Sequence, residues 1–305
     1  MAVPTTNTKL TGIQTEFGGS NPISISEYYS GGPLVPSASP APNGPIPSSG
    51  AITVGDFRGA TKASFISASG GNATLTDGDY KIHVFTGPGT FTVNAAGVGG
   101  ADNTNVDYLV QAGGGGAGSQ YGGAGGAGGT RASDQLYTGP GAAVNTGITV
   151  PATGYPITVG GGGPGGPGTG AQGSTSSAFP ISSAGGGGGG NRNAGGANAG
   201  GSGGGGVMNH GGQNPAGGSG NTPPTSPPQG NNGGTGSNST PGLGSGGGGS
   251  LVGNGGNGNG SKGGNGADGA PWAIMGSSPG APSYGTPGPS PGRYFGGGGG
   301  GGGEV

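Results

Sequence analysis

The sequence predicts a mostly irregular and β fold: a small N-terminal module, a short antiparallel β-hairpin region, and then a polyglycine II helix bundle or sandwich with long loops. Three observations lead to this prediction. Glycine supplies 92 of the 305 residues and proline 27, whereas hydrophobic residues make up 27% and charged residues 6%. Most glycines form runs after residue 112, and the segment just before them alternates apolar and polar residues. A chain of this composition buries too little side-chain surface for an ordinary core.

The first predicted domain, residues 1–64, begins with two short helices. Ile13 and Phe17 are four residues apart in a stretch that ends with two glycines, which predicts a helix of one or two turns. Ser24 lies three residues before Glu27, which is the spacing of a capping box, and predicts a second short helix.

A proline-rich connector, Pro33–Pro47, should be extended. The segments on either side of it are too short to bury their own hydrophobic residues, so we expect these to pack on one another or on a partner protein. An exposed aromatic cluster on so small a module is typical of an assembly surface. The assembly candidates are Phe17, Tyr28, Tyr29 and Phe57.

The second predicted domain, residues 65–112, is a small antiparallel β region. Tyr80–Phe85 and Thr90–Asn94 alternate with a period of two and flank the turn Thr86–Gly89, which predicts a β-hairpin. Val106–Ala112 is predicted to be a third strand that leads directly into the first glycine run.

The third predicted domain, residues 113–305, contains the glycine runs, for which two interpretations exist. A glycine run can be a flexible linker, which would make this part disordered. It can also form extended helices with three residues per turn that pack closely because glycine has no Cβ. Ordering a residue costs about 1–2 kcal/mol, and a lateral hydrogen bond returns about 0.5–1.5 kcal/mol. Only a bundle with many neighbours per helix is therefore stable, and we favour that interpretation.

Loops between the runs are the expected binding elements, because aromatic residues among Asn, Ser and Gly make adaptable recognition surfaces. The segment Pro271–Gly280 holds the only tryptophan. An alternative for its apolar residues is a plug that covers one end of the bundle. The receptor-binding candidates are Trp272, Ile274, Met275, Tyr284, Tyr121, Tyr137, His210 and Asn209. Four more aromatic residues of this region are expected to be exposed: Tyr155, Phe179, Tyr294 and Phe295.

Catalytic and metal sites are not predicted. The chain has no cysteine and two histidines, of which His83 is interpreted as a strand side chain. Asp77 and Asp79 have the spacing of calcium ligands, but no glutamate follows at the distance of a calcium loop. Paired carboxylates are absent after Asp107. We therefore expect no enzymatic activity and no cofactor.

Charge and hydropathy exclude two further classes of protein. The formal net charge is −2 and the eight basic residues are scattered, which excludes a nucleic-acid partner. The sequence contains no apolar stretch of signal-peptide or membrane-span length, so membrane insertion is not expected.

The ordered set of motifs YKIHVFTGPGTFTVN, VDYLVQAGGGGAG, YPITVGGGGPGG, AQGSTSSAFPISSAGGGGGGN and RYFGGGGGGGG resembles the glycine-rich domain found in many phage virion proteins. The glycine packing is similar to that of T-even-type phage adhesins, in which polyglycine helices carry receptor-binding loops. The N-terminal TKLTGIQTEFGGSNPISISEYYSGG looks similar to short modules in tail proteins of marine and cyanobacterial phages. The chain differs from the T-even adhesin in this N-terminal third.

This resemblance implies a structural protein of a phage tail or tail fibre that mediates host-surface attachment. Residues 1–64 would dock onto other virion proteins, and the loops of the glycine domain would face a polysaccharide or an outer-membrane protein of the host. The expected location is the virion tail, assembled in the host cytoplasm, and a homo-oligomer is left open. Two alternatives remain at this point: an architectural component such as a baseplate or capsid decoration, and a disordered glycine-rich linker.

Overall fold

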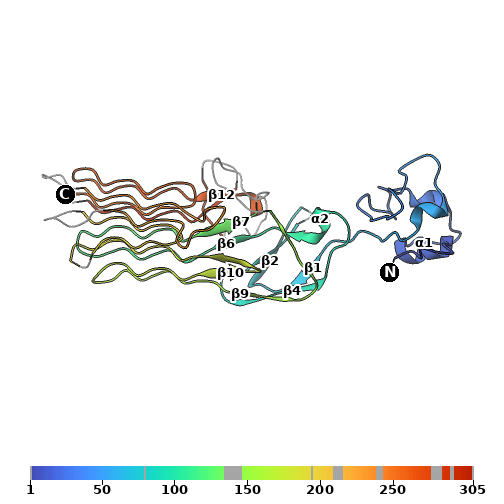
Figure 1. Ribbon diagram of the computed structural model, residues 1–305, viewed down its shortest axis with the longest axis horizontal. Coiled ribbons are helices and arrows are strands. Elements are labelled where there is room, and N and C mark those ends of the chain that lie inside the picture. The colour runs from blue at the N-terminus through green and yellow to red at the C-terminus, as the bar shows by residue number, and fades with distance from the viewer. Residues whose placement is uncertain are drawn as a thin grey trace. The chain divides into compact units, whose positions relative to one another are not determined.

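A computed structural model describes residues 2–78, 80–133, 146–193, 195–208, 216–237, 243–275, 284–288 and 292–303 (Figure 1). Over these residues the fold is mostly strand and irregular structure, with small antiparallel sheets and few helices, which confirms the coarse fold class. The chain divides into two compact units. One consists of Met1–Ser69, Thr92–Val106 and Ile148–Gly154, and the other of Gly70–Phe91, Asp107–Gly147 and Tyr155–Val305.

The N-terminal part of the first unit has three short helices: α1 (Leu10–Phe17), η1 (Ile25–Tyr28) and η2 (Val54–Phe57). Helix α1 ends where Gly18 takes φ 87°, as the glycine stop predicts. The predicted capping box is confirmed at η1, where the Glu27 carboxylate accepts a hydrogen bond from the backbone N–H of Ser24.

Aromatic residues form the core of this N-terminal part. The Phe57 ring makes edge-to-face contacts with Phe17 and Tyr28, at centroid distances of 5.9 and 6.1 Å. All three side chains are 0% exposed. The expected exposed assembly cluster is therefore corrected for these three residues, because their rings bury one another. Tyr29 is half-buried, and its hydroxyl donates to the carbonyl of Gly50.

The remainder of the first unit contains short strands and one helical turn. Strand β1 (Ser67–Ser69) pairs antiparallel with β4 (Gly89–Ala95), and β9 (Gly154–Ile157) is the third strand of that sheet. Helix α2 (Ala101–Thr104) leads into β5 (Asn105–Val106), which pairs with β8 (Ile148–Thr149).

The second unit contains a β-hairpin at a different place from the one predicted. Strand β2 (Ala73–Asp77) pairs with β3 (Tyr80–Val84) across a tight turn, with Asp77 opposite Tyr80. Strand β4 pairs with β1 and not with β3 in the described sheets, so the predicted pairing around Thr86–Gly89 is wrong. The turn between Asp77 and Tyr80 allows the closer pairing, which the sequence interpretation overlooked.

The other strands of this unit are short and pair in antiparallel twos. They are β6 (Leu109–Gln111) with β7 (Thr130–Ala132), β10 (Ser176–Ala178) with β11 (Ile181–Ser183), and β12 (Ala270–Trp272) with β13 (Arg293–Phe295). The short helix η4 (Ala273–Met275) follows β12. The predicted third strand is present in part, as β5 and β6, and β6 leads into the first glycine run.

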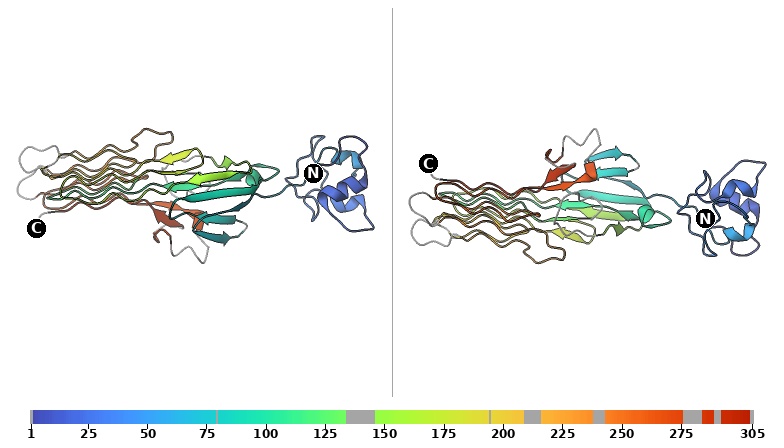
Figure 2. Two further views of the ribbon diagram at one scale, coloured as in Figure 1. Left: turned by 90° about the horizontal axis from the view of Figure 1, so that it is seen from below. Right: turned by 90° about the horizontal axis from the view of Figure 1, so that it is seen from above.

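The glycine runs of the second unit lie side by side, with the strands at one end (Figure 1, Figure 2). In the run 185–190, amides three residues apart donate to the same neighbouring run. These pairs are Gly186 to Gly113, Gly189 to Gly116, Gly187 to Ser202, and Gly190 to Gly205, with N···O distances of 2.8–3.0 Å. The run contacts segments 113–116, 123–126, 170–173, 198–201 and 202–205 through hydrogen bonds of its amides and carbonyls.

Glycine is required inside this arrangement because the runs approach so closely. A Cβ added at Gly185, Gly186, Gly187, Gly188 or Gly189 would come within 3.0 Å of a backbone oxygen of a neighbouring run. Where side chains are present, they recur every third residue, as at Tyr121, Ala124, Ala127 and Thr130. Hydrogen bonds and side chains of these runs therefore share a spacing of three residues.

Side chains on some outer runs replace hydrogen bonds that a further run would make. Asn254 and Asn257 are exposed, and their Oδ1 atoms accept from the backbone N–H groups of Asn232 and Thr235 at 3.1 and 2.9 Å. Asn232 in turn accepts from the N–H of Gly220 at 2.8 Å. The outer asparagines therefore satisfy backbone donors that face solvent.

Candidate recognition surface at the loop end

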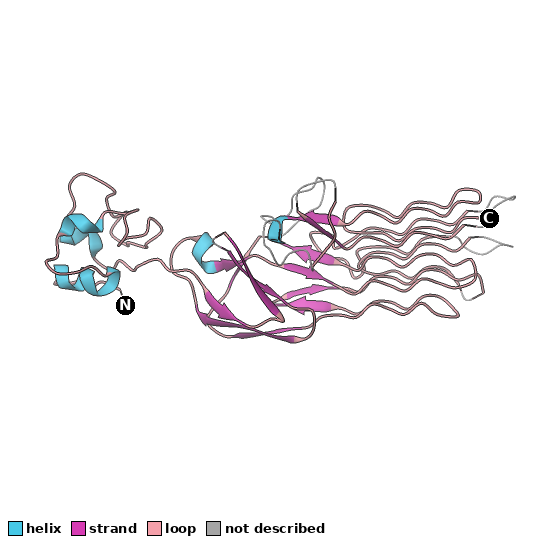
Figure 3. Cartoon of the chain, turned by 180° about the vertical axis from the view of Figure 1, so that it is seen from behind, coloured by secondary structure: helices cyan, strands magenta, loops and turns pink. Residues whose placement is uncertain are grey.

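The turns remote from the strands gather at one end of the glycine runs (Figure 3). We call this the loop end; its described turns are residues 117–122, 165–169, 191–193 with 195–197, and 259–262. Two of these turns are joined directly, since the backbone N–H of Ser119 donates to the carbonyl of Gly168 at 3.2 Å. The loop end is therefore an ordered surface built from segments far apart in sequence.

Asn191 fixes two turns of the loop end to each other. Its side chain is 1% exposed, and Nδ2 donates to the carbonyl and the hydroxyl of Ser119 at 2.7 and 3.0 Å. Its Oδ1 accepts from the backbone N–H of Asn193 at 2.7 Å. One buried amide thus positions residues that follow it in its own turn and residues 72 positions earlier in the chain.

Tyr121 and Arg192 meet on this pair of turns, where Tyr121 is exposed and Arg192 is half-buried. The Arg192 guanidinium lies 5.6 Å from the centroid of the Tyr121 ring, and Tyr121 is 42% exposed. Gln120 and Tyr121 both have left-handed backbone conformations, with φ 50° and 61°. Consecutive left-handed residues other than glycine are strained, and such strain is concentrated at functional sites. The Nδ2 of Asn193 donates to Oε1 of Gln120, which holds the two turns together at the surface.

The charges at the loop end are of one sign in the part of the chain that the structure describes. Arg192 and Lys262 lie on its turns. The described carboxylates of the second unit, Asp77, Asp107 and Asp268, end β2 or precede β6 and β12 at the strand side. Both charged side chains on the described turns of the loop end are therefore positive.

The tryptophan is in a different place from the one expected for a binding residue. Trp272 is 0% exposed and packs with Leu251, Ala132 and Ala270, so the expectation of an exposed Trp272 is corrected. Ile274 packs against this cluster and, with Tyr284, against Ile82 and Val84. This arrangement at the strand side corresponds to the plug that was the alternative interpretation.

The other described candidates are not brought to the loop end. Met275 is the last residue of η4. Tyr284, Tyr155, Phe179, Tyr294 and Phe295 are half-buried. Tyr137, Asn209 and His210 lie outside the described residues. Among the described receptor-binding candidates, Tyr121 is thus the one that lies at the loop end.

Sequence reasoning missed Gln120, Asn191, Arg192 and Asn193. A signal for them exists, because the polar stretch Asn191–Asn193 follows directly after six consecutive glycines. Polar residues that interrupt a run mark its end, and hydrogen-bonding side chains at run ends are candidates for turn contacts.

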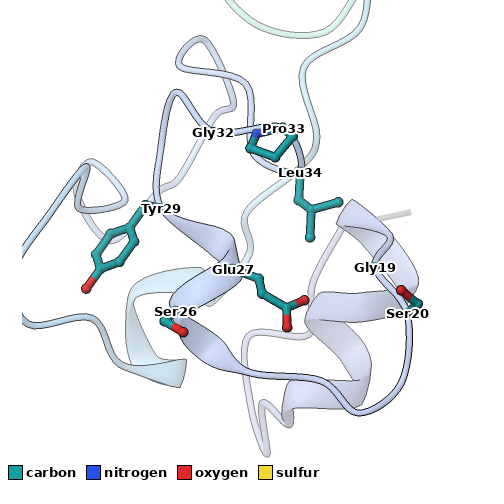
Figure 4. Close-up of a pocket in the computed structure, with 8 residues that line it drawn as sticks. All are labelled: Gly19, Ser20, Ser26, Glu27, Tyr29, Gly32, Pro33 and Leu34. Carbon is teal, nitrogen blue, oxygen red and sulfur yellow. The ribbon is translucent and has the colours of Figure 1, made fainter.

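An open pocket of about 480 Å³ lies in the N-terminal part of the first unit (Figure 4). Its lining residues are Gly19, Ser20, Ser26, Glu27, Tyr29, Gly32, Pro33 and Leu34. The carboxylate of Glu27 is already engaged in the capping box. The pocket is therefore an open recess with one acidic group.

His83 and the carboxylates form no metal cluster among the described residues. The Nδ1 atom of His83 is 2.7 Å from the carbonyl oxygen of Gly70, and its ring contacts Phe91 at 5.2 Å. Phe91 in turn contacts Phe179, which contacts Tyr155, so His83 belongs to an aromatic row beside the strands. No helix of the described residues is long and apolar enough to cross a membrane.

Comparisons with protein-family models, with curated proteins and with solved structures find no match to this chain.

Proposed function

We propose that this chain is a structural protein of a phage tail or tail fibre, and that the loop end of its glycine region attaches the virion to the host surface. The N-terminal part of the first unit would dock onto other virion proteins. The proposal assigns the chain no catalytic step and no cofactor. The observation that carries it is the pair of exposed Tyr121 and half-buried Arg192 on ordered turns at the end of the hydrogen-bonded glycine runs.

The hydrogen-bonded glycine runs between residues 113 and 303, which we call the frame, are proposed to form a polyglycine II helix bundle. The three-residue spacing of hydrogen bonds in run 185–190, and the runs that surround it, support this assignment. A frame of this kind holds a turn in place through backbone bonds on several sides, which lowers the entropy lost when a ligand binds. Limited proteolysis should therefore leave the glycine runs, residues 113–303, within a resistant fragment.

The docking role of residues 1–64 is supported by their self-contained core. Buried residues between Val3 and Ala60 pack into one cluster. A module that is stable by itself can be joined to different carriers. The pocket beside Glu27 offers such a carrier a recess on this module.

Cell binding tests the proposal. Fluorescently labelled full-length chain is incubated with a panel of bacterial strains and measured by flow cytometry, and the same protein is added in competition with phage adsorption. We expect saturable binding to susceptible strains and reduced adsorption. A stable, folded chain that binds none of the strains its phage infects would favour the architectural alternative. Rapid proteolysis of the whole glycine region would favour the disordered linker.

A further inference from the structure

We propose that the loop end binds a sugar that carries a negatively charged group, either a carboxylate or a phosphate, with Tyr121 and Arg192 as its contacts. This inference rests on the proposed function and names the class of receptor. It follows from the position of these two side chains, from the charge around them, and from the rigidity of the turns that carry them.

The Tyr121 ring supplies a surface for stacking. Arg192 covers part of the ring at 5.6 Å, and 42% of the residue is still exposed. Tyrosine combines a rigid apolar ring with a polar end, and it gains contact area at a small cost in side-chain entropy. A sugar ring presents C–H groups on one face and hydroxyls at its edge, which fits such a surface.

Arg192 supplies the charge. The planar Arg192 guanidinium lies over the Tyr121 ring, and its fixed fork of N–H groups can reach an anion beside the ring. The fork of N–H groups matches the two oxygens of a carboxylate or a phosphate, and such charge-assisted bonds are the strong ones. The ring and the guanidinium together therefore select a sugar with an adjacent anion over a neutral sugar.

The surrounding charge favours the same ligand. Lys262 is the other charged residue on the described turns of the loop end, and it is also positive. The described carboxylates of the second unit lie at the strand side. An acidic polysaccharide would thus approach the loop end without repulsion from these carboxylates.

The turns are ordered before a ligand arrives. Buried Asn191 joins the two turns through Ser119, and the backbone N–H of Met208, which is 1% exposed, donates to the carbonyl of Tyr121 at 3.4 Å. Preorganisation of this kind raises affinity because less freedom is lost on binding.

The test measures binding of full-length chain to three immobilised polysaccharides by biolayer interferometry. The probes are alginate, which carries carboxylates, phosphomannan, which carries phosphates, and neutral dextran. We expect at least about tenfold tighter binding to one or both acidic polymers than to dextran, since only these offer a partner for the guanidinium. The preferred acidic polymer identifies the charged group.

Three variants locate the site. Arg192→Gln should weaken binding to the acidic polymer by about tenfold, because it removes the charge-assisted bonds. Arg192→Lys should also weaken it, since lysine lacks the planar fork. Lys262→Gln removes the same charge from the same end and should weaken it less than about threefold, as expected for an exposed charge that acts only through the field. Unchanged thermal unfolding would show that each variant is folded.

Three results would overturn the inference: equal binding to dextran and the acidic polymers, equal losses for Arg192→Gln and Lys262→Gln, or no binding to any polymer. The first two would indicate non-selective or diffuse attraction. If the chain binds susceptible cells but shows no preference for either acidic polymer, the ligand class is wrong and the attachment function stands. If it binds acidic polymers but no cells, the attachment function fails.

Discussion

The side chain of Gln229 is bonded to the backbone of Ala184, since its Oε1 accepts a hydrogen bond from the Ala184 N–H at 2.7 Å. The Nε2 of Gln229 donates to the carbonyl of Pro223 at 2.8 Å. The backbone carbonyl of Gln229 accepts from the N–H of Thr130 at 2.8 Å. Gln229 is 1% exposed. One buried residue therefore connects three segments: the end of β11, the proline-rich loop that precedes Gln229, and the start of β7.

Replacing Gln229 with leucine should destabilise the protein. The change leaves the part-buried N–H of Ala184 without its acceptor and removes the donor to Pro223, which together cost about 1–3 kcal/mol. Urea denaturation measures the free energy of unfolding. The matched control is Gln172→Leu, because Gln172 is exposed, and its expected cost is below about 0.5 kcal/mol. Equal costs for the two variants would contradict the structural role of Gln229.

Alanine substitutions at two glycines should distinguish the tightly packed inner runs from the outer runs by their effect on stability. A Cβ at Gly187 would overlap the carbonyl of Asn198, whereas a Cβ at Gly161 has no atom within 4 Å. Gly187→Ala should therefore cost more than about 3 kcal/mol, as overpacking does in a tight interior. Gly161→Ala should be neutral or stabilising by about 0.4–1 kcal/mol, because it restricts the unfolded chain. Thermal unfolding of both variants gives the comparison, and similar melting temperatures would argue against close packing at Gly187.

The N-terminal core should lose stability at alkaline pH. Burial, with a smaller contribution from the charge of Glu27, raises the pKa of the Tyr28 hydroxyl, which donates to the carbonyl of Gly18 at 2.7 Å. A raised pKa means that Tyr28 keeps its proton up to a higher pH in the folded state than in the unfolded state. The contribution to stability is therefore complete below about pH 10 and is lost as the pH rises through the raised pKa.

The difference in absorbance between wild type and Tyr28→Phe during an alkaline titration reports the ionisation of Tyr28. We expect its midpoint above the ordinary tyrosine range. Calorimetry at increasing pH should show a transition of the N-terminal part that falls above pH ~10 and depends less on pH in Tyr28→Phe. An ordinary tyrosine midpoint would refute the burial effect.

The substitution Tyr121→Gly should abolish cell binding and leave the free energy of unfolding nearly unchanged. Tyr121 has φ 61°, and the left-handed conformation costs a residue with a Cβ about 1–2 kcal/mol. Relief of that strain offsets the greater entropy of glycine in the unfolded chain, about 0.5–1 kcal/mol, and the lost contact with Arg192, about 0.5–1 kcal/mol. The net change in the free energy of unfolding should be below about 1 kcal/mol.

The control for this variant is Tyr155→Gly in strand β9, where the tyrosine packs on Phe179 at 5.1 Å and has no left-handed backbone to relieve. It should cost more than about 2 kcal/mol, because it removes an aromatic contact and places glycine in a strand. Denaturant titration and cell binding are measured on both variants. A large loss of stability in Tyr121→Gly would show that Tyr121 is a structural residue.

Local signals predicted helices α1 and η1 and the coarse fold class. The spacing of Ile13 and Phe17 and the Ser24–Glu27 box depend on neighbours within one turn, so the sequence alone contains them. The hairpin prediction failed because alternation marks strands and does not select partners. Asp77 and Tyr80 face each other across a tighter turn than the one at Thr86–Gly89.

The candidate site was predicted less well, since it depends on which distant segments meet. Trp272 was expected at the surface because its own segment looks like a loop, and Leu251 and Ala132 bury it from elsewhere in the chain. Arg192 gave no signal of a partner until its turn was placed beside Tyr121. From Tyr121 to Thr130, every third residue has a side chain and the residues between are glycine. The start of this pattern at Tyr121 was the signal that could have located the first turn of the loop end.

The backbone bonding of the glycine runs has an evolutionary consequence. Contacts inside the frame depend on peptide groups and on the absence of side chains, whereas Asn191 and Arg192 lie in a turn between runs. A turn between two runs can therefore change in length or composition while the inner contacts stay the same. A protein built in this way can acquire new recognition properties through insertions and exchanges of single turns, without a compensating change in its interior.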